Sequence, residues 1–287
     1  MRSPPRAPTI LALSLFATSL GACASETPGT DGPAGPTPPT EPTPPSEPTP
    51  SPESSERPID PAEIVAAADR DEADREADVR REPVELLAFL DLRPGMKVAD
   101  IGAGGGYTTE LLARAVGPSG VVYGQNTPFV LERFARDAWD ARLAKPINAN
   151  VVSLEREFDD PFPADIEPLD LVINVLFYHD FEWQEVDRAA HNADVFAALR
   201  PGGRYVIVDA SAAAGHGAED SKTLHRVEES LVIEELEAAG FELAARGEFL
   251  RNRDDTRDWN ALPWREPERA ERGEYSDKFV LAFEKPG

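Results

Sequence analysis

The stretch Val98-Ala99-Asp100-Ile101-Gly102-Ala103-Gly104-Gly105-Gly106 places a carboxylate near the end of a short apolar run, with a glycine-rich loop directly behind it. Glycine lets the backbone turn sharply and lets a ligand approach the main chain without a Cβ in the way. A dinucleotide site requires Gly-x-Gly-x-x-Gly/Ala, whereas the last of those positions here is Tyr107. The Gly-x-x-x-x-Gly-Lys-Ser/Thr phosphate loop is also absent. The stretch therefore predicts a ligand-binding loop between a strand and a helix, with a poor fit to a dinucleotide.

Helix-like and strand-like segments alternate on both sides of this loop. Expected helices cover residues 84–90, 108–116, 129–143, 186–199 and 228–239, and expected strands cover 97–101, 121–125, 150–154, 169–175, 204–209, 243–249 and 279–283. This alternation predicts an α/β protein, a Rossmann-like three-layer αβα sandwich around a mostly parallel seven-stranded sheet. Ligands of such sheets bind at the carboxyl ends of the strands, where the strand order reverses.

Residues 92–104, Leu-Arg-Pro-Gly-Met-Lys-Val-Ala-Asp-Ile-Gly-Ala-Gly, resemble motif I of the class I S-adenosylmethionine-dependent methyltransferases. The resemblance implies the fold of that class and S-adenosyl-L-methionine as cofactor. It also implies that Asp100 lies near the methionine amino group of the cofactor. Gly102, Ala103 and Gly104 would then shape the loop around the amino-acid portion.

The same resemblance implies further cofactor contacts, and here the chain departs from the family pattern. A carboxylate is expected at the end of the second strand for the ribose hydroxyls, but the chain has Gln125 and Asn126. Amides can pair with a diol, although each neutral hydrogen bond is weaker than a charged one. Asp159 corresponds to the residue that meets the adenine amino group, with an acidic surface turn as the alternative. Asn174, near the end of the fourth strand, is assigned to the cofactor as well.

The segment after the fourth strand is expected to form the lip of the active cleft. A histidine in an ordinary environment titrates in the range that suits a general base, so His179 is expected to act as one, and Tyr178 is expected to orient the acceptor or the sulfonium. Asp180 is placed to orient the imidazole. The alternative is a solvated polar loop with a hydrogen-bonded histidine. Asp180 and Asp209 resemble the metal ligands of some methyltransferases, but Ala210 follows Asp209 in place of a further ligand, so no metal is predicted.

Five later segments carry a second resemblance: residues 177–180 (Phe-Tyr-His-Asp), 224–228 (Leu-His-Arg-Val-Glu), 237–241 (Glu-Ala-Ala-Gly-Phe), 250–252 (Leu-Arg-Asn) and 277–281 (Asp-Lys-Phe-Val-Leu). They resemble a little-characterised group of secreted bacterial methyltransferase-like proteins, a resemblance that does not supply a substrate. Arg226 is a candidate for binding an anionic substrate, or else belongs to the start of a helix. The long connection 251–277 has the length of a lid. Substrate contacts are predicted in it for Arg251, Asn252 and the two tryptophans Trp259 and Trp264, with a small apolar cluster under a surface loop as the alternative.

The N-terminal part of the chain has the features of an export signal and a spacer. Residues 1–22 combine a basic start, a short apolar run and small residues before Cys23, which is the single cysteine of the chain. This arrangement resembles a bacterial lipoprotein signal, so Cys23 is predicted to carry a lipid that anchors the protein to the membrane. Residues 23–60 are rich in Pro, Thr and Ser and predict a disordered linker.

Residues 61–287 are predicted to form the methyltransferase-like domain, with 61–82 as an exposed helix leading into it. The residue after Cys23 resembles an outer-membrane sorting signal, so the predicted location is the periplasmic face of the outer membrane in the bacterial cell envelope. The formal net charge is −24, which disfavours non-specific binding to nucleic acid, so no nucleic-acid partner is predicted. The sequence does not indicate the oligomeric state.

The sequence thus predicts an S-adenosylmethionine-dependent methyltransferase that acts on a small molecule in the cell envelope. The alternative is a non-catalytic binding protein that uses the same fold for another nucleoside-like or small polar ligand. A scaffold of the envelope, in which only the linker and the outer surface matter, is a third possibility.

Overall fold

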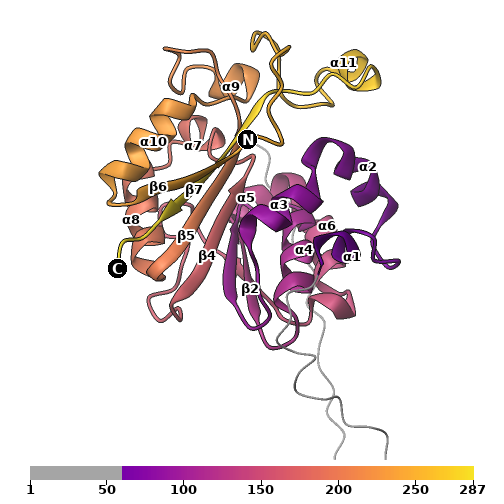
Figure 1. Cartoon of the computed structure of the whole chain (residues 1–287), viewed down its shortest axis with the longest axis vertical. Coiled ribbons are helices and arrows are strands. Elements are labelled where there is room, and N and C mark those ends of the chain that lie inside the picture. Colours follow the sequence, from indigo (N-terminus) through magenta and orange to yellow (C-terminus); the bar gives the residue numbers. More distant parts are fainter. Residues whose placement is uncertain (1–59) are drawn as a thin grey trace, which may run out of the picture. The chain divides into compact units, whose positions relative to one another are not determined.

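The computed structural model describes residues 60–287 (Figure 1). Its centre is one seven-stranded sheet in the order β3-β2-β1-β4-β5-β7-β6. The bounds are β1 Lys97–Ile101, β2 Val121–Asn126, β3 Val151–Glu155, β4 Leu169–Val175, β5 Leu199–Ala210, β6 Glu242–Gly247 and β7 Lys278–Glu284. Strands β1 to β5 pair in parallel, and β7 is antiparallel to both of its neighbours. All seven expected strands are confirmed, in a mixed sheet.

Helices cover both faces of the sheet, as Figure 1 shows. The bounds are α1 Pro61–Val65, α2 Glu72–Arg81, α3 Pro83–Leu90, α4 Tyr107–Val116, α5 Pro128–Val130, η2 Leu131–Ala135, α6 Arg136–Leu143, η3 Pro146–Asn148, α7 Asp180–Trp183, α8 Arg188–Ala198, α9 Ser221–Leu224, α10 Glu229–Ala238 and α11 Pro267–Glu271.

The two faces of the sheet bury separate apolar cores. One core joins α1, α3 and α4 to the strand residues that point to their side, such as Val98 and Val206. The other core joins α6, α8 and α10 to residues such as Ala99 and Ile207. Successive strand residues therefore alternate between the cores, as buried parallel strands require. The predicted three-layer sandwich is confirmed.

Several expected boundaries are wrong for local reasons. The segment 61–82 forms two helices in place of one exposed helix, and Ile64 and Ala77 are buried. Strand β5 begins at Leu199, where the helix was expected to end. The expected helix 129–143 contains a π-helical turn, η2, whose wider winding has no strong sequence signal.

The strand order reverses between β1 and β4, which places a crevice at their carboxyl ends. At this crevice, β1 leads into the glycine loop and β4 leads into the segment that begins at Leu176. Within residues 60–287, no helix has both the length and the apolar composition needed to cross a bilayer. The predicted signal, Cys23 and the linker lie outside the described residues, apart from Asp60 at the end of the linker.

Candidate active site

The glycine loop between β1 and α4 is held in a left-handed turn. Gly102 and Gly104 have φ angles of +65° and +56°. A Cβ on Gly102 would stand 2.5 Å from Cγ of Phe177, so this position requires glycine for space as well as for conformation. Phe177 follows β4, and the loop is therefore built against the neighbouring strand.

Two amide side chains at the end of β2, those of Gln125 and Asn126, accept hydrogen bonds from the backbone of the loop. The backbone N–H of Gly102 donates to Gln125 Oε1 at 3.1 Å, and that of Gly104 donates to Asn126 Oδ1 at 2.8 Å. Gln125 Nε2 donates to the carbonyl of Arg156 at 2.7 Å, and Asn126 Nδ2 donates to that of Gly104 at 3.2 Å. Both side chains are buried and neither lines the cavity described below. The expectation that they pair with a ribose diol is corrected: their polar atoms bind the protein itself.

Asp100 lies at the base of the loop and is 2 % exposed. Its Oδ2 accepts a hydrogen bond of 2.6 Å from Oγ1 of Thr109 on α4. Burial raises the pKa of Asp100 to about 7, against the opposing effects of the Thr109 hydroxyl and the Arg81 guanidinium. A cationic group bound next to this carboxylate would relieve the cost of its burial.

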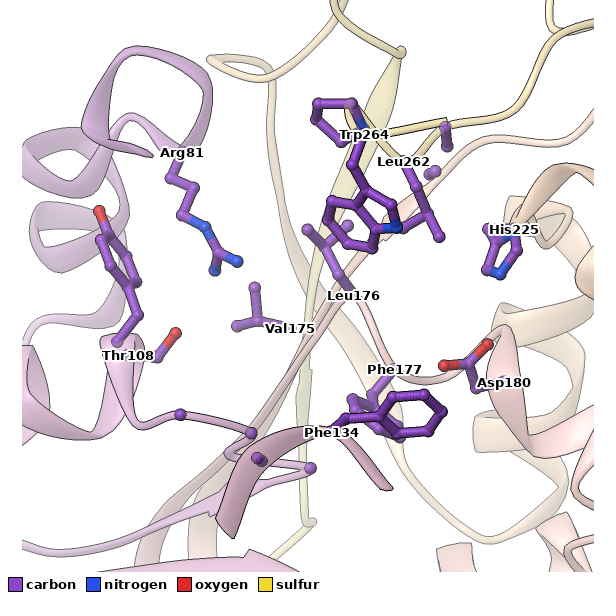
Figure 2. Close-up of a pocket in the computed structure, with 18 of the residues that line it drawn as sticks. Arg81, Thr108, Phe134, Val175, Leu176, Phe177, Asp180, His225, Leu262 and Trp264 are labelled. Carbon is purple, nitrogen blue, oxygen red and sulfur yellow. The ribbon is translucent and has the colours of Figure 1, made fainter. Parts of the chain in front are cut away.

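A cavity of about 1140 Å³ opens above the loop. That volume lies just above the range of about 300–1,000 Å³ typical of small-molecule sites. Its walls come from α2, the glycine loop, the segment 129–135, the end of β4 and the segment 261–266. Figure 2 shows Arg81 and Thr108 on one side of this space and Asp180 and His225 on the other.

Seven Arg and Lys side chains that the sequence alone did not indicate line the cavity, and Arg81 and Lys278 are two of them. Arg81 ends α2, and its Cζ lies 4.6 Å from the centroid of the Tyr107 ring. Its buried Nε has no hydrogen-bond partner among residues 60–287. Lys278 begins β7 and is 7 % exposed, and its Nζ donates to the carbonyl of Ser276 at 3.2 Å. Burial, reinforced by the charge of Arg81, lowers the pKa of Lys278 to about 8.

The chain turns sharply after β4, where Leu176 has a φ of +60°. This turn brings the His179 side chain back toward the sheet, where it is 2 % exposed. Its Nδ1 lies 2.7 Å from Oδ1 of Asp209, and its backbone N–H donates to Oδ2 of the same residue at 2.8 Å. Its Nε2 lies 3.1 Å from Oδ1 of Asp180, in an ion-pair contact without the alignment of a hydrogen bond.

This environment decides the protonation of His179. Burial disfavours the imidazolium, but the carboxylates of Asp209 and Asp180 outweigh it and raise the pKa of His179 to about 10. The imidazole is therefore protonated at neutral pH. Such a group holds its neighbours in place but is poorly suited to accept a proton, so its geometry favours a positioning role over that of a general base.

His225 stands beside this group, with its ring centroid 5.6 Å from that of His179. It is half-buried and lines the cavity. Burial and the charge of His179 lower the pKa of His225, so its imidazole is neutral. Its Nδ1 faces Nδ2 of Asn260 at 3.0 Å.

Tyr178, Asn174 and Asp159 are not brought to the cavity. The Tyr178 hydroxyl donates to Oε2 of Glu235 at 2.7 Å in the core under α10, which is on the opposite side of the chain from His179. Asn174 is fully buried in β4. Asp159 is exposed, as its alternative interpretation as a surface turn predicts.

The three polar residues assigned to the substrate also bind the protein itself. Arg226 is fully buried, and its guanidinium contacts both carboxylate oxygens of Asp255, at 2.8 and 3.2 Å. Arg251 pairs with Glu229, and Nδ2 of Asn252 donates to a backbone carbonyl at 2.6 Å. None of the three lines the cavity. Trp259 and Trp264, from the same connection, do line it.

Among residues 60–287, no group of three or more His, Cys, Asp or Glu side chains is arranged to hold a metal ion. The carboxylates of Asp180 and Asp209 face His179 from two sides, so the two carboxylates share one imidazolium.

A match to a known sequence family lies in the glycine-loop half of the domain. The sequence model of the protein-L-isoaspartate(D-aspartate) O-methyltransferase family matches residues 83–139. A protein-L-isoaspartate O-methyltransferase from Aeropyrum pernix is 46% identical over 52 residues, which is 18% of this chain and 20% of the relative. Its counterpart from Methanothrix thermoacetophila is 46% identical over 58 residues, which is 20% of this chain and 28% of the relative. The matched stretch thus spans about a fifth to a quarter of these relatives.

Structural similarity extends over the whole domain. The structure of an S-adenosylmethionine-dependent methyltransferase from Aquifex aeolicus matches with a TM-score of 0.51 and 18% identity, covering 79% of this chain and 99% of that one. The fold is therefore that of the class I methyltransferases. The family match ends at residue 139, so the side of the cavity that contains Asp180 and His225 lies outside the matched residues.

Proposed function

We propose that the protein is an S-adenosylmethionine-dependent methyltransferase that acts on a small acceptor in the bacterial cell envelope. The proposal rests on one observation: a single cavity contains the glycine loop, the carboxyl group of Asp100 and the guanidinium group of Arg81. Asp100 lies at the loop, and Arg81 approaches it from α2 without a carboxylate partner of its own among the described residues. The matched segment 83–139 includes the loop and Asp100.

The residues present fit the methionine portion of this cofactor. That portion carries an ammonium group and a carboxylate, and the cavity offers the carboxylate of Asp100 and the guanidinium of Arg81. The loop at residues 102–104 leaves the backbone accessible, as an amino-acid ligand requires. Phe129 and Val130, just after β2, offer an apolar surface for the rings of the cofactor, but they cannot hydrogen-bond to the ribose hydroxyls.

When bound, the cofactor supplies an electrophilic methyl group on a sulfonium. The protein must then hold the acceptor in line with that methyl group, exclude water and receive a proton from the acceptor. Asp180 lines the cavity and is kept ionised, because the charge of His179 outweighs burial and lowers the pKa of Asp180. His179 acts through Asp180 and does not itself accept the proton.

A binding experiment with the full chain tests the cofactor site without knowledge of the acceptor. Isothermal titration with S-adenosylmethionine and with S-adenosylhomocysteine is expected to give saturable binding. Asp100→Ala is expected to abolish it, and Asp159→Ala, which removes an exposed carboxylate away from the cavity, is expected to leave it unchanged. The absence of heat with either ligand would exclude the methyltransferase proposal.

A non-catalytic binding protein is the second candidate. One observation favours it: the polar atoms of Gln125 and Asn126 hydrogen-bond to the protein itself. These two residues at the end of β2 therefore offer no charged group to bind the ribose hydroxyls. Binding of another nucleoside-like ligand in the Asp100→Ala protein, without turnover in the native protein, would support this candidate.

The envelope location is proposed from the sequence of residues 1–23. We infer that Cys23 becomes the lipidated first residue of the mature protein, attached at the periplasmic face of the outer membrane. Cell fractionation of the full chain and of Cys23→Ser tests this. The native protein is expected in the outer-membrane fraction and the variant in a soluble or uncleaved form; the same distribution for both would contradict the lipid anchor.

A further inference from the structure

Large apolar side chains that are exposed to solvent gather at the cavity. Five such residues occur in the described part of the chain, and three of them, Phe129, Phe134 and Trp264, line this one cavity. Phe134 and Trp264 are 70% and 71% exposed. Exposure of this kind is costly in water, and a concentration of it in a concave site marks a surface for an apolar ligand.

These aromatic groups come from two different parts of the fold. Phe134 is presented by the π-helical turn η2, and its ring packs edge-on against Phe129 with centroids 5.8 Å apart. Trp264 comes from the connection between β6 and β7. Figure 2 shows Trp264 and Leu262 across the cavity from Phe134. The opposed side chains leave between them a slot with apolar walls.

Two polar groups of opposite hydrogen-bonding character stand at one side of the slot. Oδ1 of Asp180 accepts from Nε1 of Trp183 at 2.6 Å, and among residues 60–287 its Oδ2 accepts no hydrogen bond. The other group is His225, which lies next to Asp180 in Figure 2. A carboxylate oxygen can only accept a hydrogen bond from the ligand.

The hydrogen-bond network assigns the tautomer of His225. Oδ1 of Asn260 accepts from the backbone N–H of Leu262 at 3.0 Å, which fixes the orientation of the amide. Nδ2 of Asn260 then donates to the carbonyl of Thr223 at 2.8 Å and to Nδ1 of His225 at 3.0 Å. A neutral imidazole that accepts at Nδ1 carries its proton on Nε2, so His225 is a hydrogen-bond donor.

The charges around this pair select the class of acceptor. A carboxylate would be repelled by Asp180. A protonated amine could donate to Asp180, but it would lie next to the donor His225 and near the imidazolium of His179. A neutral hydroxyl group donates to Asp180 and accepts from His225, so of these three groups it alone satisfies both partners.

We propose, on the basis of the methyltransferase function above, that the acceptor is an apolar hydroxy compound of the phenol class, with its body between Trp264 and Phe134 and its hydroxyl between Asp180 and His225. In the transfer, the hydroxyl oxygen forms a bond to the methyl carbon while the bond from that carbon to sulfur breaks. The electron pair of the broken bond stays on sulfur, which leaves as the thioether. The hydroxyl proton passes to Asp180, and the product is an aryl methyl ether.

Three compounds with one apolar body test the class of acceptor. The full chain is incubated with methyl-labelled S-adenosylmethionine and para-butylphenol, para-butylbenzylamine or para-butylbenzoate, which are neutral, cationic and anionic near neutral pH. Labelled ether is expected from the phenol only. Methylation of the amine or the acid in preference to the phenol, or of an isoaspartyl peptide added to the panel, would overturn the proposal while leaving the methyltransferase function intact.

Single-residue variants test the role of the apolar slot and the role of the proton acceptor, Asp180, separately. Trp264→Ala is expected to raise KM for the phenol about tenfold without changing the affinity for S-adenosylhomocysteine. Asp180→Asn is expected to lower kcat about a hundredfold or more with little change in KM. Val79→Ala, which truncates an exposed apolar residue outside the cavity, serves as the matched control and is expected to behave as the native protein.

The cofactor titration distinguishes the two possible failures. If S-adenosylhomocysteine binds but none of the three compounds is methylated, the phenol proposal is refuted and the cofactor site stands. If S-adenosylhomocysteine and S-adenosylmethionine both fail to bind, the methyltransferase function itself is refuted, and the acceptor proposal falls with it.

Discussion

Replacement of Asp100 by Asn is expected to stabilise the protein, and the gain is expected to grow with pH. Burial raises the pKa of this carboxyl group from 3.8 to about 7. The folded chain therefore holds the proton more tightly than the unfolded chain does. The contribution of the neutral acid to the free energy of unfolding is complete below about pH 4 and is lost as the pH rises to about 7.

The size of the effect follows from the two pKa values. A difference of one in pKa is worth about 1.4 kcal/mol, so ionisation lowers the free energy of unfolding by about 4 kcal/mol above about pH 7 and by about 2 kcal/mol near pH 5. Asn cannot ionise, and its amide oxygen can still accept the hydrogen bond from Thr109. The variant should therefore exceed the native protein by about 4 kcal/mol at about pH 8 and by about 2 kcal/mol at about pH 5.

Urea unfolding of the full-length native and variant chains at both pH values measures these differences. Other titrating groups are common to the two proteins and cancel in the comparison. Asp159→Asn, at an exposed carboxylate, is the control and should change the free energy of unfolding by less than about 0.5 kcal/mol. An equal gain at the two pH values, or a loss in stability, would refute the argument that burial of the charge dominates at Asp100.

Three other changes test separate parts of the structure. Gly102→Ala should lower the free energy of unfolding by about 1–3 kcal/mol, because the φ of +65° is strained for alanine and the new Cβ would stand 2.5 Å from Phe177; an unchanged urea midpoint would contradict this. Arg226→Met should lower the free energy of unfolding by about 3–5 kcal/mol, because Asp255 is left buried without its cation. In a double-mutant cycle, Asp255→Leu should recover part of this loss, whereas additive losses in the free energy of unfolding would argue against the ion pair. His179→Gln should destabilise most below about pH 6.5 and progressively less toward pH 10, since the folded chain holds the imidazolium up to its raised pKa of about 10. Melting temperatures over that range check this, and a loss independent of pH would exclude a charged imidazole.

The sheet and the glycine loop could be predicted because their signals are local. The expected strand 97–101 and the expected strand 169–175 agree with β1 and β4 at both ends, since each is a short apolar run bounded by polar or turn-forming residues. The loop after β1 likewise depends on neighbouring glycines. The fold class follows from the order of such segments and needs no knowledge of side-chain partners.

The site was harder to predict because it depends on where side chains point and on what they contact across long sequence separations. Tyr178 and His179 are adjacent, yet one enters the core under α10 and the other faces Asp209. Arg226 finds its carboxylate in Asp255, 29 residues away. Arg81 ends a charged helix whose composition gave no indication that one of its cations turns inward.

The connection between β6 and β7 is fastened where it leaves the sheet and where it returns. Lys278 N–H donates to the carbonyl of Leu250 at 3.1 Å, Asn252 N–H donates to Asp277 at 2.8 Å, and Asp277 N–H donates to Asp255 at 2.6 Å. These hydrogen bonds hold the two ends of the connection together, and they do not involve residues 262–266 at its tip. A segment of different length could then replace residues 262–266 and alter the acceptor preference while the pairing register of β6 and β7 stays the same. These residues are therefore a suitable position for grafting other segments in directed evolution.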